Sequence, residues 1–113
     1  MRRDAAALLD AAKFAENIQQ LMQGIDRSRF EADLRTQSAI LYQLTVLGEA
    51  IKRLSREFRQ QHPDIEWKAI AGMRDQVTHQ YDRVDLDVVW ETVQRDIPEF
   101  LEKLAPLVPQ NLS

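Results

Sequence analysis

The segment from Arg74 to Tyr81 carries three residue types that could act together on a phosphodiester. Arg74 is a permanent cation whose guanidinium can hold a phosphate through two parallel hydrogen bonds. His79 can take up and release protons near neutral pH, as a general acid or base must do. Tyr81 adds a phenolic hydroxyl two residues further on. These residue types indicate phosphate chemistry in this segment.

The spacing between Arg74 and His79 limits what one helix could do with them. Residues five apart lie about 140° apart around an α-helix. The two positions therefore share no face unless the helix ends between them or a second chain completes the site. A surface arginine, a histidine near the negative end of the helix dipole and a tyrosine in a turn explain the same residues without chemistry. Spacing alone favours that explanation.

A second group of candidates is basic. Lys52, Arg56 and Arg59 recur at i, i+4 and i+7 and predict a stripe along one face of a long helix. Such a stripe could guide a phosphate backbone and is the best local candidate for RNA binding, although most stripes of this kind are only solvated. A net charge of −3 excludes a protein that coats nucleic acid through bulk electrostatics.

Composition predicts one small helical domain covering residues 1–113. The chain is 44% apolar and 29% charged, with three glycines, four prolines and no cysteine. We therefore expect neither disulfides nor a thiolate metal site, and a cytoplasmic location is consistent with this. No apolar run is long enough to span a membrane. The acidic pairs Asp85 with Asp87 and Glu99 with Glu102 are typical of solvated helix faces, so we predict no metal site and no cofactor.

The elements that must position the motif are predicted as helices. Apolar residues at spacings of three and four predict a first helix over about 4–23, and the strongest stripe runs from Ile40 to Phe58. Ser28 and Glu31 have the spacing of a capping box, which predicts a second helix from residue 28. This helix is expected to continue to about residue 60, with a break near 33–36.

Two further helices follow. His62-Pro63 ends the long helix, and Asp64 is expected to cap a third helix over about 65–79. Val84, Asp85 and Val89 have the spacing of a hydrophobic staple around an N-cap and predict a fourth helix. Pro98 should kink this helix by displacing the carbonyl of the residue four positions earlier. The tail after about residue 106 is expected to be extended.

Four helices with short turns predict an all-α fold, an antiparallel bundle of four main helices with room for one extra short helix. The apolar stripes define its expected core. The predicted core residues are Leu44, Leu47, Ile51, Leu54, Trp67, Ile70, Val93, Ile97 and Leu101.

At the motif the sequence resembles the HEPN superfamily, and within it the HepT-like ribonuclease toxins, whose motif is Arg-x4–6-His, here extended to Arg-x4-His-x-Tyr. The surrounding residues are also similar to that family: the run 48–52, the run 65–74, and Val84-Asp85 followed by Trp90. The similarity covers nearly the whole chain, to about residue 106. Two positions depart from the family pattern: Asp75 replaces a frequent asparagine, and Gln80 replaces a frequent acidic residue.

The resemblance implies a homodimer in which two motif segments meet and form one metal-independent endoribonuclease site. RNA supplies its own nucleophile, the 2′-hydroxyl, so a base, an acid and a cation suffice. By the same resemblance, His79 would transfer protons, Arg74 would stabilise the charged transition state and Asp75 would position one of them. A minimal nucleotidyltransferase antitoxin would silence this toxin, in a type VII-like toxin–antitoxin pair, by attaching AMP to Tyr81.

Two other interpretations stay open. The chain could be a non-catalytic helical partner of a nucleotidyltransferase, using the same groove to bind a nucleotide or the enzyme itself. It could also be a purely structural dimerisation bundle, which would leave the motif to chance. Cleavage of RNA in a metal-free buffer, lost on His79→Ala, separates the ribonuclease interpretation from these two alternatives.

Overall fold

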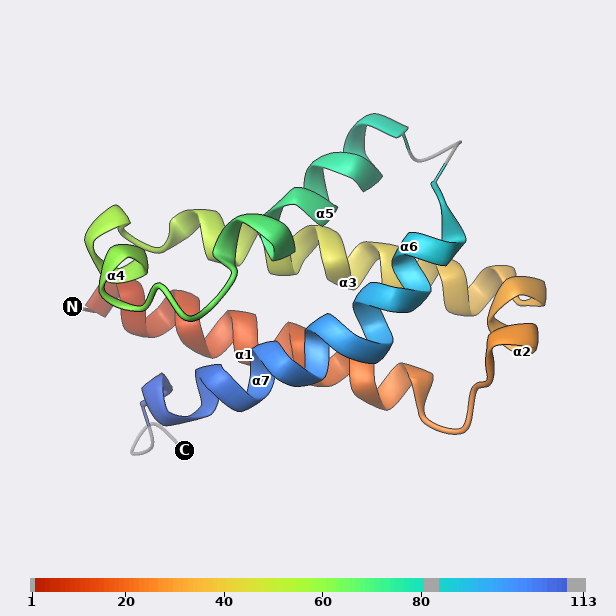
Figure 1. The fold of residues 1–113 in the computed structure, drawn as a ribbon, viewed down its shortest axis with the longest axis horizontal. Coiled ribbons are helices and arrows are strands. Elements are labelled where there is room, and N and C mark those ends of the chain that lie inside the picture. The colour runs from red at the N-terminus through yellow and green to blue at the C-terminus, as the bar shows by residue number, and fades with distance from the viewer. Residues whose placement is uncertain (1, 81–83, 110–113) are drawn as a thin grey trace.

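The computed structural model describes residues 2–80 and 84–109, and all regular structure in these two ranges is helical. Four helices form the body of the fold (Figure 1). They are α1 (Arg2–Met22), α3 (Leu34–Arg53), α5 (Trp67–Gln80) and α7 (Ile97–Leu104). The shorter elements are α2 (Arg27–Ala32), α4 (Arg56–Gln61), α6 (Leu86–Glu91), the π-helical η2 (Thr92–Asp96) and the 3-10 turn η3 (Ala105–Leu107).

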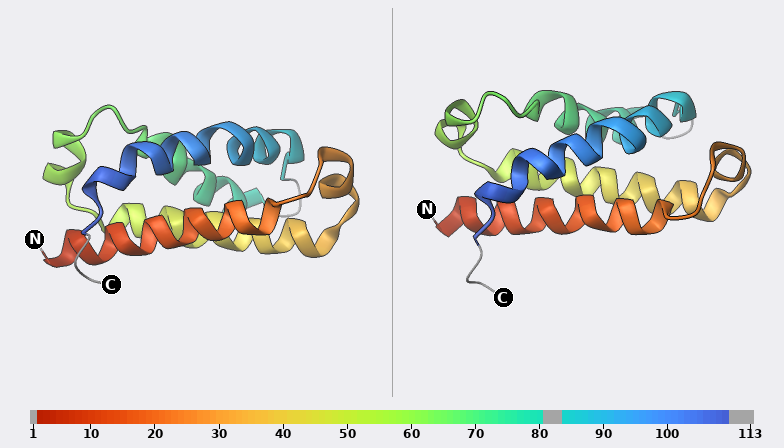
Figure 2. Two further views of the ribbon diagram at one scale, coloured as in Figure 1. Left: turned by 90° about the horizontal axis from the view of Figure 1, so that it is seen from below. Right: turned by 60° about the horizontal axis from the view of Figure 1, so that its bottom comes forward.

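The main helices alternate in direction along the chain. Helices α1 and α3 lie antiparallel, α5 packs on α3, and α7 packs on α1 (Figures 1 and 2). The predicted all-α bundle of four main helices is confirmed. No helix of the described ranges is long and apolar enough to cross a membrane.

The core lies where the predicted stripes meet. Of the nine predicted core residues, eight are buried, and Leu101 is half-buried at the edge of the cluster. Trp67 is 7% exposed, and its indole Nε1 donates a hydrogen bond to the carbonyl of His62 at 3.0 Å. This tryptophan therefore belongs to the core, as predicted, and its one polar atom is satisfied.

The start of α2 differs from the prediction. Gly24 adopts φ +76° after the end of α1, and Asp26 then caps α2 by accepting the amide of Arg29 at 2.8 Å. Ser28 lies inside α2, so the predicted capping box there was wrong. Asp26 lies two residues before Ser28, and its carboxylate accepts an otherwise unpaired amide of the first turn, so the helix begins before Ser28.

The predicted break near 33–36 is confirmed. Asp33 separates α2 from α3 and accepts hydrogen bonds from the amides of Arg35 and Thr36. The Thr36 hydroxyl donates to the same carboxylate at 2.8 Å, and this bond is the main cause that lowers the pKa of Asp33.

The predicted continuation of this helix to residue 60 was wrong, because α3 ends at Arg53 and Ser55 caps the separate helix α4. Asp4 of α1, 4% exposed, accepts the Ser55 amide at 2.8 Å and the Ser55 hydroxyl at 2.9 Å. The bond from the Ser55 amide is the main cause that lowers the pKa of Asp4. A carboxylate from 51 residues earlier thus holds the corner between α3 and α4.

Helix α5 begins at Trp67, two residues later than expected. The carbonyl of Glu66 accepts the amide of Ile70, so Glu66 and not Asp64 occupies the cap position. The Asp64 carbonyl instead accepts a hydrogen bond from Lys103 Nζ at 2.7 Å. This hydrogen bond ties the loop at Asp64 to α7.

The predicted start of the last helix is confirmed, and the predicted kink in its middle is replaced by a π-turn. Asp85 caps α6, with Val84 half-buried and Val89 buried beside it, as the staple predicted. Instead of a simple kink before Pro98, the chain forms the π-helical η2, in which the Ile97 amide bonds to the Thr92 carbonyl. The wider turn accommodates the proline, which has no amide to give to the residue four positions before it.

Candidate functional site

The motif lies on α5, which continues without interruption to Gln80. The side chains of Arg74 and His79, and the whole of Tyr81, lie outside the described residues. The helix does not end between Arg74 and His79, so their positions stay about 140° apart around its axis. The end of the helix therefore does not bring these two positions to one face.

Asp75 has a different relation to the motif. It lies four residues before His79 on the same helix, so the two positions are neighbours on one face. A carboxylate at that spacing can orient an imidazole or stabilise its protonated form. Helix register therefore places position 75 on the same face of α5 as position 79.

Lys52 reaches the motif from α3. Its Nζ lies 2.9 Å from Asp75 Oδ1, and both side chains are about half exposed. An exposed pair of this kind stabilises the fold by only about 0–1 kcal/mol. Its main effect is electrostatic, because the ammonium group offsets the negative charge that Asp75 brings to the motif. Lys52 was predicted as an RNA ligand, and the structure places it beside Asp75.

Arg56 and Arg59 lie elsewhere. The break after α3 puts them on α4, so the predicted stripe shared with Lys52 along one helix face does not form. Both arginines line an open pocket at the start of α5, together with Lys68. We call these three residues and the hollow between them the basic pocket. Its volume of about 780 Å³ lies within the range of ligand sites, roughly 300–1,000 Å³.

The basic pocket has an electrostatic character of its own. Glu66 is the one acidic residue among its described lining residues, against three cations. The Nε atom of Arg59 is buried and has no hydrogen-bond partner in the described part of the chain. Sequence reasoning missed Lys68, because this residue joins the two arginines only through the turn between α4 and α5.

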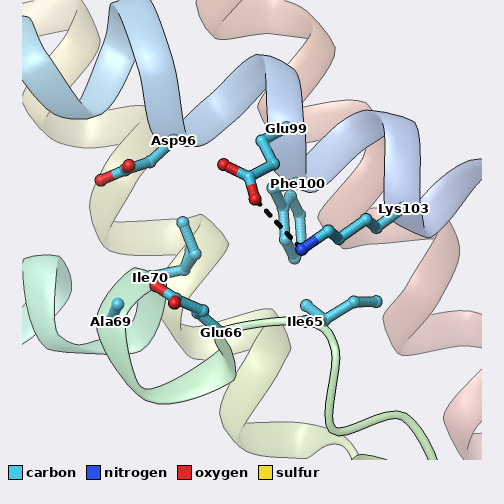
Figure 3. A pocket seen from close by; sticks show the side chains of 8 residues that line it. All are labelled: Ile65, Glu66, Ala69, Ile70, Asp96, Glu99, Phe100 and Lys103. Carbon is cyan, nitrogen blue, oxygen red and sulfur yellow. Dashed lines mark ion pairs between the residues drawn. The ribbon is translucent and has the colours of Figure 1, made fainter.

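A second pocket lies between α5 and the last helix, and we call it the seam pocket (Figure 3). Glu66, Asp96 and Glu99 line it, and Glu99 pairs with Lys103 at 3.0 Å. The hydrogen bond that Lys103 donates to the Glu99 carboxylate is the main cause that raises the pKa of Lys103. A volume of about 30 Å³ has room for about two water molecules and not for a nucleotide.

The acidic lining of the seam pocket would also repel phosphate. Within residues 2–80 and 84–109, no group of three or more His, Cys, Asp or Glu side chains could hold a metal ion. The basic pocket, and Lys52 beside position 75 of the motif helix, therefore suit phosphate better than the seam pocket does.

Comparison with known proteins points to the same chemistry. The sequence model of the family described as "Ribonuclease HepT-like" matches residues 11–107. A protein of Thermococcus cleftensis named "Probable ribonuclease HepT" is 38% identical over 100 residues, which cover 88% of this chain and 91% of that protein. A "Putative RNase" of Methanocaldococcus jannaschii is 33% identical over 108 residues, 95% of this chain and 93% of the other. No solved structure gives a significant match.

Proposed function

Because the chain belongs to the HepT-like ribonuclease family, we propose that it is a metal-independent endoribonuclease, the toxin of a type VII-like toxin–antitoxin pair. Two copies form the active enzyme. The observation that carries this proposal is the unbroken helix α5, which holds the positions of Arg74 and His79 on different sides of one axis. A two-fold partner supplies the missing half of the site.

The reaction needs few groups. A base removes the proton of the 2′-hydroxyl, and the 2′-oxygen attacks the adjacent phosphorus. The bond to the 5′-oxygen breaks, and an acid protonates this leaving oxygen, which gives a 2′,3′-cyclic phosphate and a 5′-hydroxyl. His79 transfers protons in this scheme, and Arg74 stabilises the additional negative charge on the phosphate oxygens in the transition state.

Asp75 would be expected to weaken phosphate binding if its charge faced the substrate alone. Its ion pair with Lys52 at 2.9 Å offsets that charge and leaves the carboxylate on the His79 side of α5. We therefore assign Asp75 as a positioning residue for His79. The alternative of a non-catalytic partner protein rests on Asp75 and on the net charge of −3, and the ion pair with Lys52 weakens only the first of these two arguments.

The test is cleavage of single-stranded RNA by the purified chain in buffer containing EDTA. We expect products that carry 2′,3′-cyclic phosphate and 5′-hydroxyl ends, and a dimer by light scattering at micromolar concentration. Cleavage that requires magnesium and continues after both Arg74→Ala and His79→Ala would overturn the ribonuclease assignment.

Regulation is proposed at Tyr81, two residues beyond His79. A nucleotidyltransferase antitoxin would transfer AMP from ATP to the tyrosine hydroxyl and release pyrophosphate. The new negative charge and bulk would repel and obstruct an anionic RNA strand close to the motif. Tyr81→Phe keeps the ring and removes the acceptor oxygen, so this variant should cut RNA and escape silencing.

Intact-mass spectrometry after incubation with the antitoxin and ATP checks this regulation. The wild-type chain should gain the mass of AMP, and the Phe variant should gain none. Equal labelling of both chains would place the modification at another residue.

A further inference from the structure

The outward side of α5 joins the motif to the basic pocket. Lys68, Gly72, Asp75 and His79 follow one another at spacings of four, three and four, so these helix positions form a single stripe. Lys68 and Gly72 are exposed, whereas Ile70 and Met73 face the core. We call these four positions the outer stripe. One end of it is the motif histidine, and the other end opens into the basic pocket.

Nothing in the described part of the chain explains why position 72, in the middle of the outer stripe, is glycine. It is helical, and a Cβ built on it meets no described atom within 4 Å. Glycine is an unfavourable residue inside a helix, so its presence at an exposed position needs another explanation. A bare backbone allows close approach of a ligand, here between Lys68 and Asp75.

The charges along the stripe suit an anionic strand. Asp75 is paired with Lys52, and the basic pocket adds Arg56, Arg59 and Lys68. Arg59 lines this pocket, and a guanidinium can hold a phosphate through two parallel hydrogen bonds. Positions 68 and 79 are about 16 Å apart along the axis, which exceeds the length of one nucleotide.

We propose that the outer stripe is the path of the RNA backbone, and that Arg56, Arg59 and Lys68 hold a phosphate several nucleotides from the one that is cut. This inference rests on the proposed ribonuclease function and adds to it a second phosphate site that a dinucleotide substrate cannot reach. The enzyme therefore favours long single strands over short ones.

Binding is measured by fluorescence anisotropy with 2′-O-methyl RNA, which lacks the nucleophile and stays intact. In the variant Arg56→Gln/Arg59→Gln/Lys68→Gln we expect affinity for a long strand to fall roughly tenfold or more. The slope of log affinity against log salt should fall by about 0.7, because the contact to one phosphate is lost. The control Lys13→Gln/Arg29→Gln/Arg35→Gln removes equal charge from residues that line neither the pocket nor α5.

Two single variants keep the test valid if the triple variant unfolds. Lys68→Glu changes an exposed residue, and Gly72→Gln adds a neutral side chain to the stripe. Both should weaken binding several-fold while melting near the wild-type temperature. Wild-type affinity and salt slope in all these variants, or an equal loss in the control, would overturn the inference.

Cleavage gives a separate readout. The ratio of kcat/KM on a long RNA to kcat/KM on a dinucleotide should fall about tenfold in the triple variant, since only the long strand reaches the basic pocket. A wild-type chain that binds RNA through this pocket and never cuts it would refute the ribonuclease function and leave the second site standing. An unchanged ratio would refute the second site alone.

Discussion

The two sides of α5 carry different kinds of residue, buried apolar ones on the inner side and exposed or half-exposed ones on the outer stripe. The inner side carries Trp67, Ile70 and Met73, all buried, and is fixed by the shape of the core. The outer stripe carries an exposed lysine, an exposed glycine and a half-exposed aspartate, none of which the core needs. The register of this helix thus separates the buried core residues from the outer stripe, whereas position 74, four residues after Ile70, follows the inner side. Substitutions on one side should change folding, and those on the other should change activity.

The largest effect should come from the motif. Removing a general acid or base typically lowers the rate about 10²- to 10⁴-fold, so His79→Ala should nearly abolish RNA cleavage in EDTA. Arg74→Ala should have a similar effect through lost charge stabilisation. Thermal unfolding followed by circular dichroism should be close to that of the wild type. A large loss of stability in His79→Ala would mean that the outer side also serves the fold.

Next in size is a substitution on the inner side. Ile70 is 4% exposed, and Ile70→Ala should lower the free energy of unfolding by about 2–5 kcal/mol through lost burial and a residual cavity. Urea denaturation measures this change. Cleavage per folded molecule, at a temperature where the variant is still folded, should stay near the wild-type rate. A fall in that rate as large as for His79→Ala would end the separation between the two sides.

A substitution at the corner between α3 and α4 should lower the free energy of unfolding by a smaller amount, which depends on pH. Asp4→Ala leaves the Ser55 amide without its partner and should cost about 1–3 kcal/mol of stability at neutral pH. The folded-state pKa of Asp4 is lowered, so between the two pKa values the unfolded chain binds more protons. The contribution is therefore complete above the unfolded value, about 3.9, and is lost as pH falls through the folded value.

Urea midpoints measured across this acid range check the prediction. The difference between wild type and Asp4→Ala should be constant near neutral pH and should shrink as the solution becomes more acidic. A difference that grows on acidification would contradict the assigned direction of the pKa.

The smallest effect is a gain. Gly72→Ala adds a methyl group where nothing described lies within 4 Å, and alanine in a helix is favoured over glycine by about 1 kcal/mol. The variant should unfold at a slightly higher urea concentration. Loss of stability would show that the glycine serves packing, which would remove one support from the proposed RNA path.

Local patterns were sufficient to predict the bundle, its core and some helix boundaries. The apolar stripes placed Leu44, Leu47 and Ile51 in the core, and all three are buried. The break near 33–36 and the cap at Asp85 were predicted, and both involve hydrogen bonds to neighbours within three residues. The family resemblance stated from the motif is confirmed by the match over residues 11–107.

Several errors came from contacts that join distant parts of the chain, whereas the wrong capping box at Ser28 has a local cause in the neighbouring Asp26. Nothing near Ser55 indicates that Asp4 ends α3 there, and nothing near Asp64 indicates that Lys103 takes its carbonyl. The same reason hid Lys68 as a member of the basic pocket. The pairing of Lys52 with Asp75 likewise depends on how α3 and α5 pack. Catalytic roles and dimerisation stay predictions, to be decided by the experiments above.

The π-helical η2 also affects how relatives should be compared with this chain. A π-turn closes over one residue more than an α-turn, so Thr92–Asp96 behaves as a one-residue insertion within a helix. A homologue whose last helix is α throughout would align correctly only with a gap inside that helix. Alignments that forbid such gaps would shift every residue after Asp96 by one place and assign Ile97 and Phe100 to the wrong columns.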